Sequence, residues 1–492
     1  MKVLHLTAGA GPMYCGSCLH GNTLAAALGK LGLDVLLVPV YTPLRTDEQD
    51  VSSGHVALGG ISVYVDHVSG VGWLPRFVRR LLDRPGLLRW AARRGTRTRP
   101  ERLGPLTISV LRGREGRLRR QVLDLAAWVA DEVRPDVIHL SNVMLAGLAP
   151  ALRARWPAPL VCTLSGEDSF IEKLPPRFAA QARAVLRQRA AELDALIAMN
   201  RYYAGFMADY LAVPTERIHV IPPGLNLVGH RTPEVEGGRR RAEGGRRKAE
   251  GERPPTAAES PGPDVPGAAG CEAASPSPNS PPSALCPPPS PLPAPCSPLP
   301  TIGFLGRICP DKGLHLLLEA VHLLAAEPGV PAFRVRAAGY LDPGDRPYLA
   351  DLLRQAAAWG LGQRFEYLGE LDRPAKIAFL ESLDVLAAPS VLPESKGLVV
   401  LEAWASGVPA VLPAHGAFPE MIADTGGGLL FAPGSAAELA AALARTLREP
   451  RLAEACGRQA QQAVHQRYTA ERMAWQTREL YGRLAPSLRA PS

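Results

Sequence analysis

The sequence has few aromatic residues and scattered cysteines, and it lacks a long uninterrupted apolar run. Aromatic residues make up 6% of the 492 residues, which disfavours a protein that stacks nucleic-acid bases on aromatic rings. The eight cysteines do not form the dense pattern of a small secreted disulfide framework. We find neither the ~18 apolar residues of a spanning helix nor the apolar region of a signal peptide. These absences predict a cytoplasmic protein without nucleic-acid partners.

One long segment has almost no residues that could form a core. Between residues 231 and 300 the chain has 18 prolines and 8 glycines, but only five Leu, Val, Ile or Phe residues. So little apolar surface cannot offset the entropy lost when a backbone becomes ordered. We therefore predict a disordered linker over residues 229–300. A docking tract, or a basic tract that touches nucleic acid, is the alternative.

On both sides of this linker, short apolar runs alternate with helical patterns. The runs in residues 1–228 are KVLHL, DVLLVPV, DVIHLSN, PLVCTL, ALIAMN and HVIPPG; those in residues 301–470 are TIGFLG, FRVRAAG, FEYLGE, VLAAPS, PAVLP and GLLF. Continuous apolar strands between amphipathic helices predict parallel sheets covered on both faces. The fold class is therefore α/β, with two Rossmann-like doubly wound domains facing a cleft. Residues 471–492 predict a terminal helix and tail that pack back on the first domain, and GHVALGGISVYVDH suggests a hairpin insertion.

The stretch PSVLPESKGLVVLEAWASGVP has the strongest chemical pattern. Glu394 and Glu402 are separated by seven residues, and a helix is expected to begin at Gly397. The free N–H groups of a helix start, here including that of Leu398, form a site for a diphosphate. Glu402 could accept hydrogen bonds from two ribose hydroxyls, and Glu394 could reach a sugar on the far side of the phosphate.

A second element, GFLGRICPDKG, follows the first predicted strand of the second half. Arg307 and Lys312 flank a turn that opens a helix, and two such cations would clamp a diphosphate and stabilise it as a leaving group. Either cation alone would be read as a solvated surface residue. Together with Glu394 and Glu402 in this order, they favour a functional site.

At these residues the second half resembles glycosyltransferase family 4, retaining enzymes of the GT-B fold. The resemblance implies that Arg307 and Lys312 bind the donor diphosphate with the amides of Gly397 and Leu398. It further implies that Glu402 holds the donor ribose and that Glu394 is the catalytic residue beside the transferred sugar.

The expected reaction moves a sugar from a nucleotide-diphosphate sugar to an acceptor hydroxyl on a glycan, a lipid or a small molecule. The resemblance implies no metal and no cofactor besides the nucleotide-sugar co-substrate. A nucleotide-sugar epimerase and a catalytically weakened nucleotide-sugar-binding protein remain the alternatives.

Two positions depart from the family pattern. Many relatives have Phe where this chain has Lys396, a cation that could touch phosphate or face solvent. Relatives often have His where Ser165 stands in the loop SGEDSF. Glu167 and Asp168 are nearby polar candidates for the cleft, so the identity of any assisting group is left open.

Residues 71–102 carry ten arginines against Asp83 and Glu101. Interleaved apolar residues would let this segment lie on an anionic membrane surface. Pro75 and Pro85 weaken that interpretation because they interrupt a helix. A surface insertion with snorkelling arginines explains the pattern equally well, and nucleic-acid binding is a third alternative.

The stretch GAGPMYCGSC follows the first predicted strand and precedes a helix. Its glycines, Gly9, Gly11 and Gly16, do not fit the G-x-G-x-x-G dinucleotide fingerprint. We interpret the stretch as a cleft-lining loop, because backbone passes close to ligands at this place in Rossmann-like domains. A reactive thiol within the Cys15–Cys18 pair remains an alternative.

The linker composition leads to a first prediction. Replacing most of residues 231–300 by a short flexible linker should leave the soluble yield and the thermal midpoint of unfolding nearly unchanged, because the segment contributes no core. Loss of soluble protein would show that the segment is structural.

Overall fold

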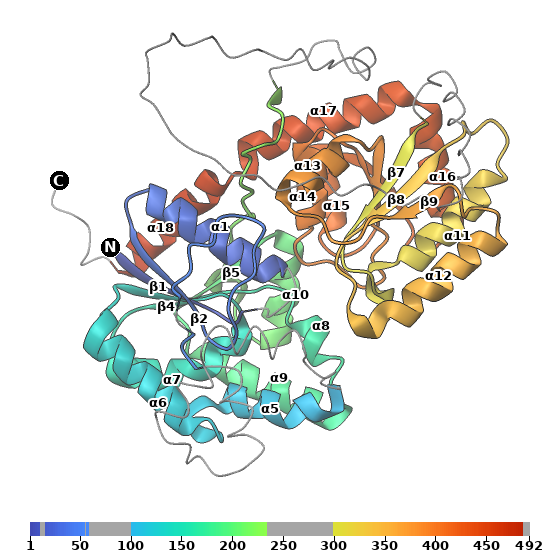
Figure 1. Ribbon diagram of the computed structural model, residues 1–492. Coiled ribbons are helices and arrows are strands. Elements are labelled where there is room, and N and C mark those ends of the chain that lie inside the picture. Colours follow the sequence, from blue (N-terminus) through green and yellow to red (C-terminus); the bar gives the residue numbers. More distant parts are fainter. Residues whose placement is uncertain (10–14, 55, 59–99, 234–298, 486–492) are drawn as a thin grey trace, which may run out of the picture. The chain divides into compact units, whose positions relative to one another are not determined.

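The computed structural model describes residues 1–9, 15–54, 56–58, 100–233 and 299–485, all within one compact unit (Figure 1). The described part contains two separate six-stranded sheets, and every strand pair in them is parallel. The first sheet has the spatial order β2 (Asp34–Pro39), β1 (Lys2–Thr7), β3 (Val137–Leu140), β4 (Leu160–Thr163), β5 (Ala195–Ala198), β6 (Ile218–Val220).

Helices connect the strands of this first sheet, as parallel pairing requires. They are α1 (Gly16–Lys30), α5 (Pro100–Arg112), α6 (Arg119–Trp128), α7 (Ala149–Arg155), α8 (Asp168–Ile171), α9 (Pro176–Ala191) and α10 (Arg201–Leu211). A π-helical turn, Val129–Val133, extends α6, and 3₁₀ turns cover Gly113–Glu115, Val143–Leu148 and Thr215–Arg217.

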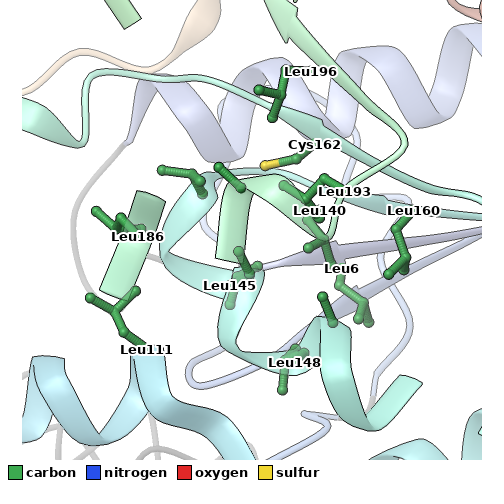
Figure 2. Packing of buried hydrophobic residues seen from close by; sticks show 14 of the residues in the cluster. Leu6, Leu111, Leu140, Leu145, Leu148, Leu160, Cys162, Leu186, Leu193 and Leu196 are labelled. Carbon is green, nitrogen blue, oxygen red and sulfur yellow. The ribbon is translucent and has the colours of Figure 1, made fainter. Parts of the chain in front are cut away.

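Apolar side chains from strands and helices form the core of this half. Leu6 of β1, Leu140 of β3, and Leu160 and Cys162 of β4 belong to one buried cluster with Leu186 of α9 (Figure 2). Each fully buried leucine contributes on the order of 2 kcal/mol of transfer free energy. The cluster explains why these strands appear in the sequence as nearly continuous apolar runs.

The second sheet has the spatial order β12 (Gly428–Phe431), β11 (Ala410–Pro413), β10 (Val385–Ala387), β7 (Thr301–Leu305), β8 (Arg334–Ala338), β9 (Phe365–Tyr367). Its helices are α11 (Leu314–Ala325), α12 (Arg346–Ala358), α13 (Arg373–Glu381), α14 (Leu398–Ala405), α15 (Phe418–Thr425) and α16 (Ala436–Arg448), with 3₁₀ turns at Pro310–Lys312 and Pro343–Asp345. All six strands predicted for this half are present, so the predicted doubly wound α/β fold class is confirmed.

Several helix starts follow from local sequence. Asn200, Asp372, Ser435 and Thr469 each occupy an N-cap, and each side chain accepts a hydrogen bond from a backbone N–H three residues later. Such caps satisfy donors that the first helical turn leaves free, and each stabilises its helix by about 1 kcal/mol. At the other end of α1, Gly32 adopts φ +80°, the left-handed conformation that favours glycine after a helix.

Two helices end the described chain, α17 (Pro450–Arg467) and α18 (Ala470–Leu484). Helix α17 packs on α14, whereas α18 packs on α1, so the last helix lies against the first one (Figure 1). Ala474 and Tyr481 of α18 share a buried cluster with Val3 and Leu24.

Both sheets change winding direction, the first sheet one strand in from its β2 edge and the second sheet at its centre. In the first sheet β1 lies between β2 and β3, and in the second β7 lies between β8 and β10. Ligands of open α/β sheets bind outside the carboxyl ends of the strands at such switch points. The loops after β7 and β10, which carry the predicted site residues, therefore meet at the switch point of the second sheet.

Three predicted features fall largely or wholly outside the described residues. They are residues 234–298 of the predicted linker, residues 71–99 of the arginine-rich segment, and most of the suggested hairpin insertion. These three predictions therefore stay predictions. Among the described helices, none is long and apolar enough to cross a membrane.

A buried polar contact joins α18 to the first sheet. The ring of His139 on β3 has Nδ1 at 2.6 Å from the Tyr481 hydroxyl and Nε2 at 2.7 Å from Oγ1 of Thr163. Burial lowers the pKa of His139 well below its usual value, so the ring is neutral at pH 7. A neutral imidazole has one donor and one acceptor, and this arrangement gives each ring nitrogen a hydroxyl partner.

This contact yields a second prediction. Tyr481→Phe should lower the free energy of unfolding by about 1–3 kcal/mol, because it leaves a buried imidazole nitrogen without a partner. Urea titration followed by circular dichroism measures the change. Trp475→Ala is the matched control on the same helix, since Trp475 is 53% exposed and should change stability by less than about 0.5 kcal/mol. Equal effects of the two substitutions would contradict the prediction.

Candidate active site

Helix α14 begins at the carboxyl edge of the second sheet, directly after the loop that follows β10. Its N-cap is Gly397, with φ +65°. A Cβ at this position would lie 2.6 Å from Sδ of Met421, so both the backbone conformation and the packing require glycine. The N–H of Val400 already donates to the carbonyl of Gly397 at 3.0 Å. The N–H groups of Leu398 and Val399, at the very start of the helix, have no acceptor within it and can bind an anion.

The loops after β7 and β10 approach each other at backbone distance. A Cβ on Gly313 would lie only 1.9 Å from the carbonyl oxygen of Pro389, and Gly313 has φ +74°. The N–H of Val391 donates to the carbonyl of Asp311 at 2.9 Å. These contacts fix the 3₁₀ turn before α11 beside the loop that leads to α14.

That approach brings two predicted site residues together. Nζ of Lys312 forms an ion pair with Oε1 of Glu394, and the Ser390 hydroxyl donates to the same oxygen at 2.8 Å. Burial acts to raise the pKa of Glu394, but the charge and hydrogen bond of Lys312, together with Ser390, lower it overall. Glu394 is therefore an ionised carboxylate at neutral pH, and its side chain is 22% exposed.

Arg307 lies at the beginning of the same β7 loop but makes a different contact. Its side chain is exposed, and its Nε lies 3.4 Å from Sγ of Cys309. The described interactions do not connect Arg307 with Glu394.

Glu402 belongs to a buried group of charges. Nζ of Lys376, on α13, pairs with both Glu402 and Asp47, and Arg373 on the same helix lies 3.5 Å from Glu48. The side chains of these residues are between 6% and 15% exposed. Three carboxylates thus share two cations. Because the group is buried, removing one charge would leave its partner uncompensated and would lower the stability of the fold.

A pocket lies beside these charges. Polar and apolar side chains from both halves line it, namely Leu19, His20, Thr23, Glu48, Gly224, Leu225, Asn226, His230, Arg373, Leu398 and Glu402. The free space inside the pocket is about that of one water molecule, and its walls carry charged and hydrogen-bond-accepting groups.

The first turn of α1 lies against the start of α14. A Cβ on Gly16 would lie 3.3 Å from Cδ1 of Leu398, and Nζ of Lys396 lies 2.6 Å from Oγ of Ser17. Lys396 is therefore partly buried against α1. Its sequence context suggests contact with phosphate or exposure to solvent, and the hydrogen bond to Ser17 is a different contact.

Of the other two glycines predicted to line the cleft, only Gly9 lies among the described residues. Gly9 has φ +81°, and a Cβ there would lie 1.9 Å from the carbonyl oxygen of Thr42, so this position requires glycine for packing. Gly11 lies outside the described residues.

The polar side chains of the loop after β4 form hydrogen bonds with one another and with neighbouring backbone groups. The carboxylate of Glu167 accepts from the N–H of Ser165 at 2.8 Å, from the Ser165 hydroxyl at 3.1 Å and from the N–H of Val143 at 3.0 Å. Burial raises the pKa of Glu167, and these N–H donors oppose that rise. Asp168 accepts from the Tyr203 hydroxyl at 2.6 Å.

Two family descriptions match the chain. Residues 297–463 match Glycosyl transferases group 1, and residues 20–228 match Glycosyltransferase Family 4. Together they cover about three quarters of the chain. The chain belongs to glycosyltransferase family 4. The resemblance inferred from the motifs of the second half is thereby confirmed.

Curated members of this family are similar to parts of the chain. A 2-deoxystreptamine glucosyltransferase of Streptomyces kanamyceticus is 37% identical over 31% of this chain and 37% of its own length. A phosphatidyl-myo-inositol mannosyltransferase of Mycobacterium leprae is 34% identical over 38% of this chain and 47% of its own. A D-inositol 3-phosphate glycosyltransferase of Jonesia denitrificans is 27% identical over 64% and 63%, respectively. The chain thus spans between 37% and 63% of the length of these relatives.

Solved structures share the fold over nearly the whole chain. The sucrose-phosphate synthase of Thermosynechococcus elongatus has a TM-score of 0.63 at 16% identity and covers 99% of this chain and all of its own. HepE from Anabaena, in complex with UDP-glucose, has a TM-score of 0.58 at 17% identity and covers 98% of this chain and all of its own. At such identities the likeness concerns the fold alone.

Some residues beside the candidate site of this glycosyltransferase family 4 chain could not be predicted from the sequence. Lys376 lies within an ordinary amphipathic helix, and Asn200 donates from Nδ2 to the carbonyl of Ser395 at 2.7 Å across a large sequence separation. Only the folded chain brings such residues together. Within the described residues, no group of three or more His, Cys, Asp or Glu side chains is arranged to hold a metal.

The buried charges yield a third prediction. Lys376→Met should lower the free energy of unfolding by about 3–5 kcal/mol, because Asp47 and Glu402 lose their shared cation while staying buried. Urea titration at pH 7 measures this effect. Arg354→Met is the control, since Arg354 pairs with Asp351 on the surface with 77% and 64% exposure, where a pair contributes about 0–1 kcal/mol. A change at Lys376 no larger than the control would contradict the prediction.

Proposed function

We propose that this chain is a retaining glycosyltransferase that moves a sugar from a nucleotide-diphosphate sugar to an acceptor hydroxyl. The observation that carries the proposal is the ionised Glu394 held beside Lys312, directly ahead of the free N–H groups of α14. Family membership supports the reaction class. The joint presence of a cation, a carboxylate and a helix start at a switch point supports a donor with both phosphate and sugar parts.

The donor diphosphate would bind at the start of α14. The amides of Gly397 and Leu398 would bind its oxygens, and Lys312 and Arg307 would neutralise its charge. Lys312 is 37% exposed, so its ammonium can contact a ligand while it stays near Glu394. Fixed cations and oriented N–H groups supply leaving-group stabilisation without a metal ion or another cofactor.

The donor ribose would bind at Glu402, whose carboxylate lines the pocket described above. A carboxylate can accept hydrogen bonds from both hydroxyls of a ribose. Lys376 already forms an ion pair with Oε1 of Glu402 at 2.5 Å. Lys376 would thus orient the acceptor group for the ribose.

The transfer would proceed by attack on the face from which the leaving group departs. The bond between the anomeric carbon and the diphosphate oxygen breaks, and a bond to the acceptor oxygen forms on the same face. The acceptor proton passes to the departing phosphate oxygen. Glu394 would accept hydrogen bonds from the sugar hydroxyls and stabilise the positive charge that develops on the ring.

The acceptor and the surroundings of the enzyme belong to the same proposal. Relatives whose names contain inositol make an inositol phosphate the first acceptor to test. The arginine-rich segment 71–102 would support contact with an anionic membrane if the acceptor is a lipid.

A fourth prediction tests this function in two steps. The purified chain is first screened by thermal shift against UDP-, GDP- and ADP-sugars, because a ligand that binds the folded state raises the midpoint by mass action. The donor found in this way is then combined with D-inositol 3-phosphate and other acceptors. We expect one nucleotide series to raise the midpoint, and the transfer product to retain the anomeric configuration of the donor.

The same transfer assay compares Glu394→Gln with the parent chain. This change keeps the size of the side chain and removes its charge, so turnover should fall by about a hundredfold or more while the donor still raises the thermal midpoint. Glu366→Gln is the control, because Glu366 forms an exposed ion pair with Arg336 and should leave turnover unchanged. Unchanged turnover in Glu394→Gln would contradict the catalytic role proposed for Glu394.

Other outcomes would point to the alternative functions. Conversion of the donor sugar without any acceptor would favour an epimerase. Donor binding without transfer or hydrolysis would favour a binding protein. Ser165, which stands where relatives often have His and hydrogen-bonds Glu167, is the residue that motivates this alternative.

A further inference from the structure

Two cysteines stand at the start of α1, where no step of the proposed transfer uses them. Cys15 is the N-cap of the helix and is partly exposed, whereas Cys18 is in its first turn and is 2% exposed. Residues three apart in a helical turn have Cβ atoms about 5–6 Å apart, and a disulfide needs about 3.5–4.5 Å. Joining the pair therefore requires the two Cβ atoms to move about 1–2 Å closer, through a small backbone shift at the N-cap of α1.

A cation from the other half of the chain lies at this pair. Nζ of Lys396 is 2.6 Å from the hydroxyl of Ser17, the residue between the two cysteines. The charged and titratable groups around this ammonium are Cys15, Cys18, Glu167, Glu394 and His20. Burial lowers the pKa of Lys396, and the charges of Cys15, Glu167 and Glu394 oppose that effect. The amino group whose charged form these anions favour lies beside the two thiols.

The surroundings of the two sulfur atoms differ. A hydrogen bond from Cys18 lowers the pKa of Cys15 to about 5, with burial opposing and the Lys396 charge and nearby N–H groups assisting. The hydrogen bond to Cys15 and burial raise the pKa of Cys18. At neutral pH Cys15 is therefore a thiolate, while Cys18 keeps its proton. Cys456, a partly exposed cysteine of α17, has a pKa raised by burial.

We propose that Cys15 and Cys18 form a redox-active dithiol, in which Cys15 attacks a low-molecular-weight disulfide, Cys18 resolves the mixed disulfide, and Lys396 is the cation beside the attacking sulfur. Cys15 forms a bond to one sulfur of the disulfide and releases the other as a thiolate. Cys18 then loses its proton to solvent, bonds to the Cys15 sulfur and releases the second thiolate. Two protein thiols are oxidised to one disulfide, and the small disulfide is reduced to two thiols.

This chemistry goes beyond glycosyl transfer and does not depend on it. Its readouts are thiol reactivity and disulfide content, so failure of the proposed transferase function leaves them measurable. Because Gly16 and Ser17 contact Leu398 and Lys396, the dithiol would also lie next to the proposed diphosphate site.

The first part of the fifth prediction concerns the disulfide. The reduced full-length chain is equilibrated with graded ratios of reduced and oxidised glutathione, quenched in acid, alkylated and digested. As the mixture becomes oxidising, we expect the peptide with Cys15 and Cys18 to escape alkylation and to appear two hydrogen atoms below its unmodified mass, while Cys456 remains alkylated. In Cys18→Ser, a glutathione adduct should accumulate at Cys15. A pair that stays reduced at every ratio would overturn the proposal.

The second part tests the role of Lys396. The alkylation rate of Cys15 by iodoacetamide, followed by mass spectrometry, should already be near its plateau at pH 6. Lys396→Gln should move the profile to higher pH and lower the rate at pH 6 by about tenfold, and Lys396→Arg should restore it. Lys30→Gln, at the opposite end of α1, is the control and should leave the profile unchanged. If the alkylation rate of Cys15 depends on pH in the same way as that of Cys456, the proposal is overturned. If Lys396→Gln leaves the pH dependence of Cys15 unaltered, the role proposed for Lys396 is wrong.

Discussion

The backbone contact between Gly313 and Pro389 is the constraint on which the candidate site depends. A side chain at Gly313 would collide with a carbonyl oxygen at 1.9 Å, so only glycine lets the loops after β7 and β10 meet. Their meeting brings Lys312 to Glu394, although 82 residues separate them. The strand order makes this meeting possible, because β7 and β10 are neighbours at the centre of the sheet. Topology and one missing Cβ therefore create the pairing of cation and carboxylate.

Every carboxylate proposed for catalysis or donor binding is already held by a partner. Lys312 lowers the pKa of Glu394, and Lys376 pairs with Glu402. Leaving such groups unpaired and buried would cost several kcal/mol. The lowered pKa keeps Glu394 ionised, and an ionised carboxylate accepts hydroxyl hydrogen bonds. Stability and the proposed chemistry thus require the same pairs, so a substitution such as Lys376→Met affects both.

The first turn of α1 and the start of α14 form a second meeting point. Lys396 stands where family members often have an aromatic residue, and its ammonium reaches Ser17 rather than solvent. A cation at this place changes what the neighbouring sulfur atoms can do, because it favours the thiolate of Cys15. The departure from the family pattern and the Cys-x-x-Cys motif, which seem unrelated in the sequence, thereby become parts of one structural feature.

The sequence by itself determined the two parallel sheets, the helix start at Gly397 and the family. These follow from apolar periodicity, from glycine at a position that needs a left-handed backbone, and from a motif contained within a few dozen residues. Only the tertiary structure decided which charges share a partner. Lys376 with Asp47, Lys396 with Ser17 and Glu167 with Val143 join segments that are far apart in the chain. No local pattern encodes such contacts, because they arise where strand order brings different loops to the same edge.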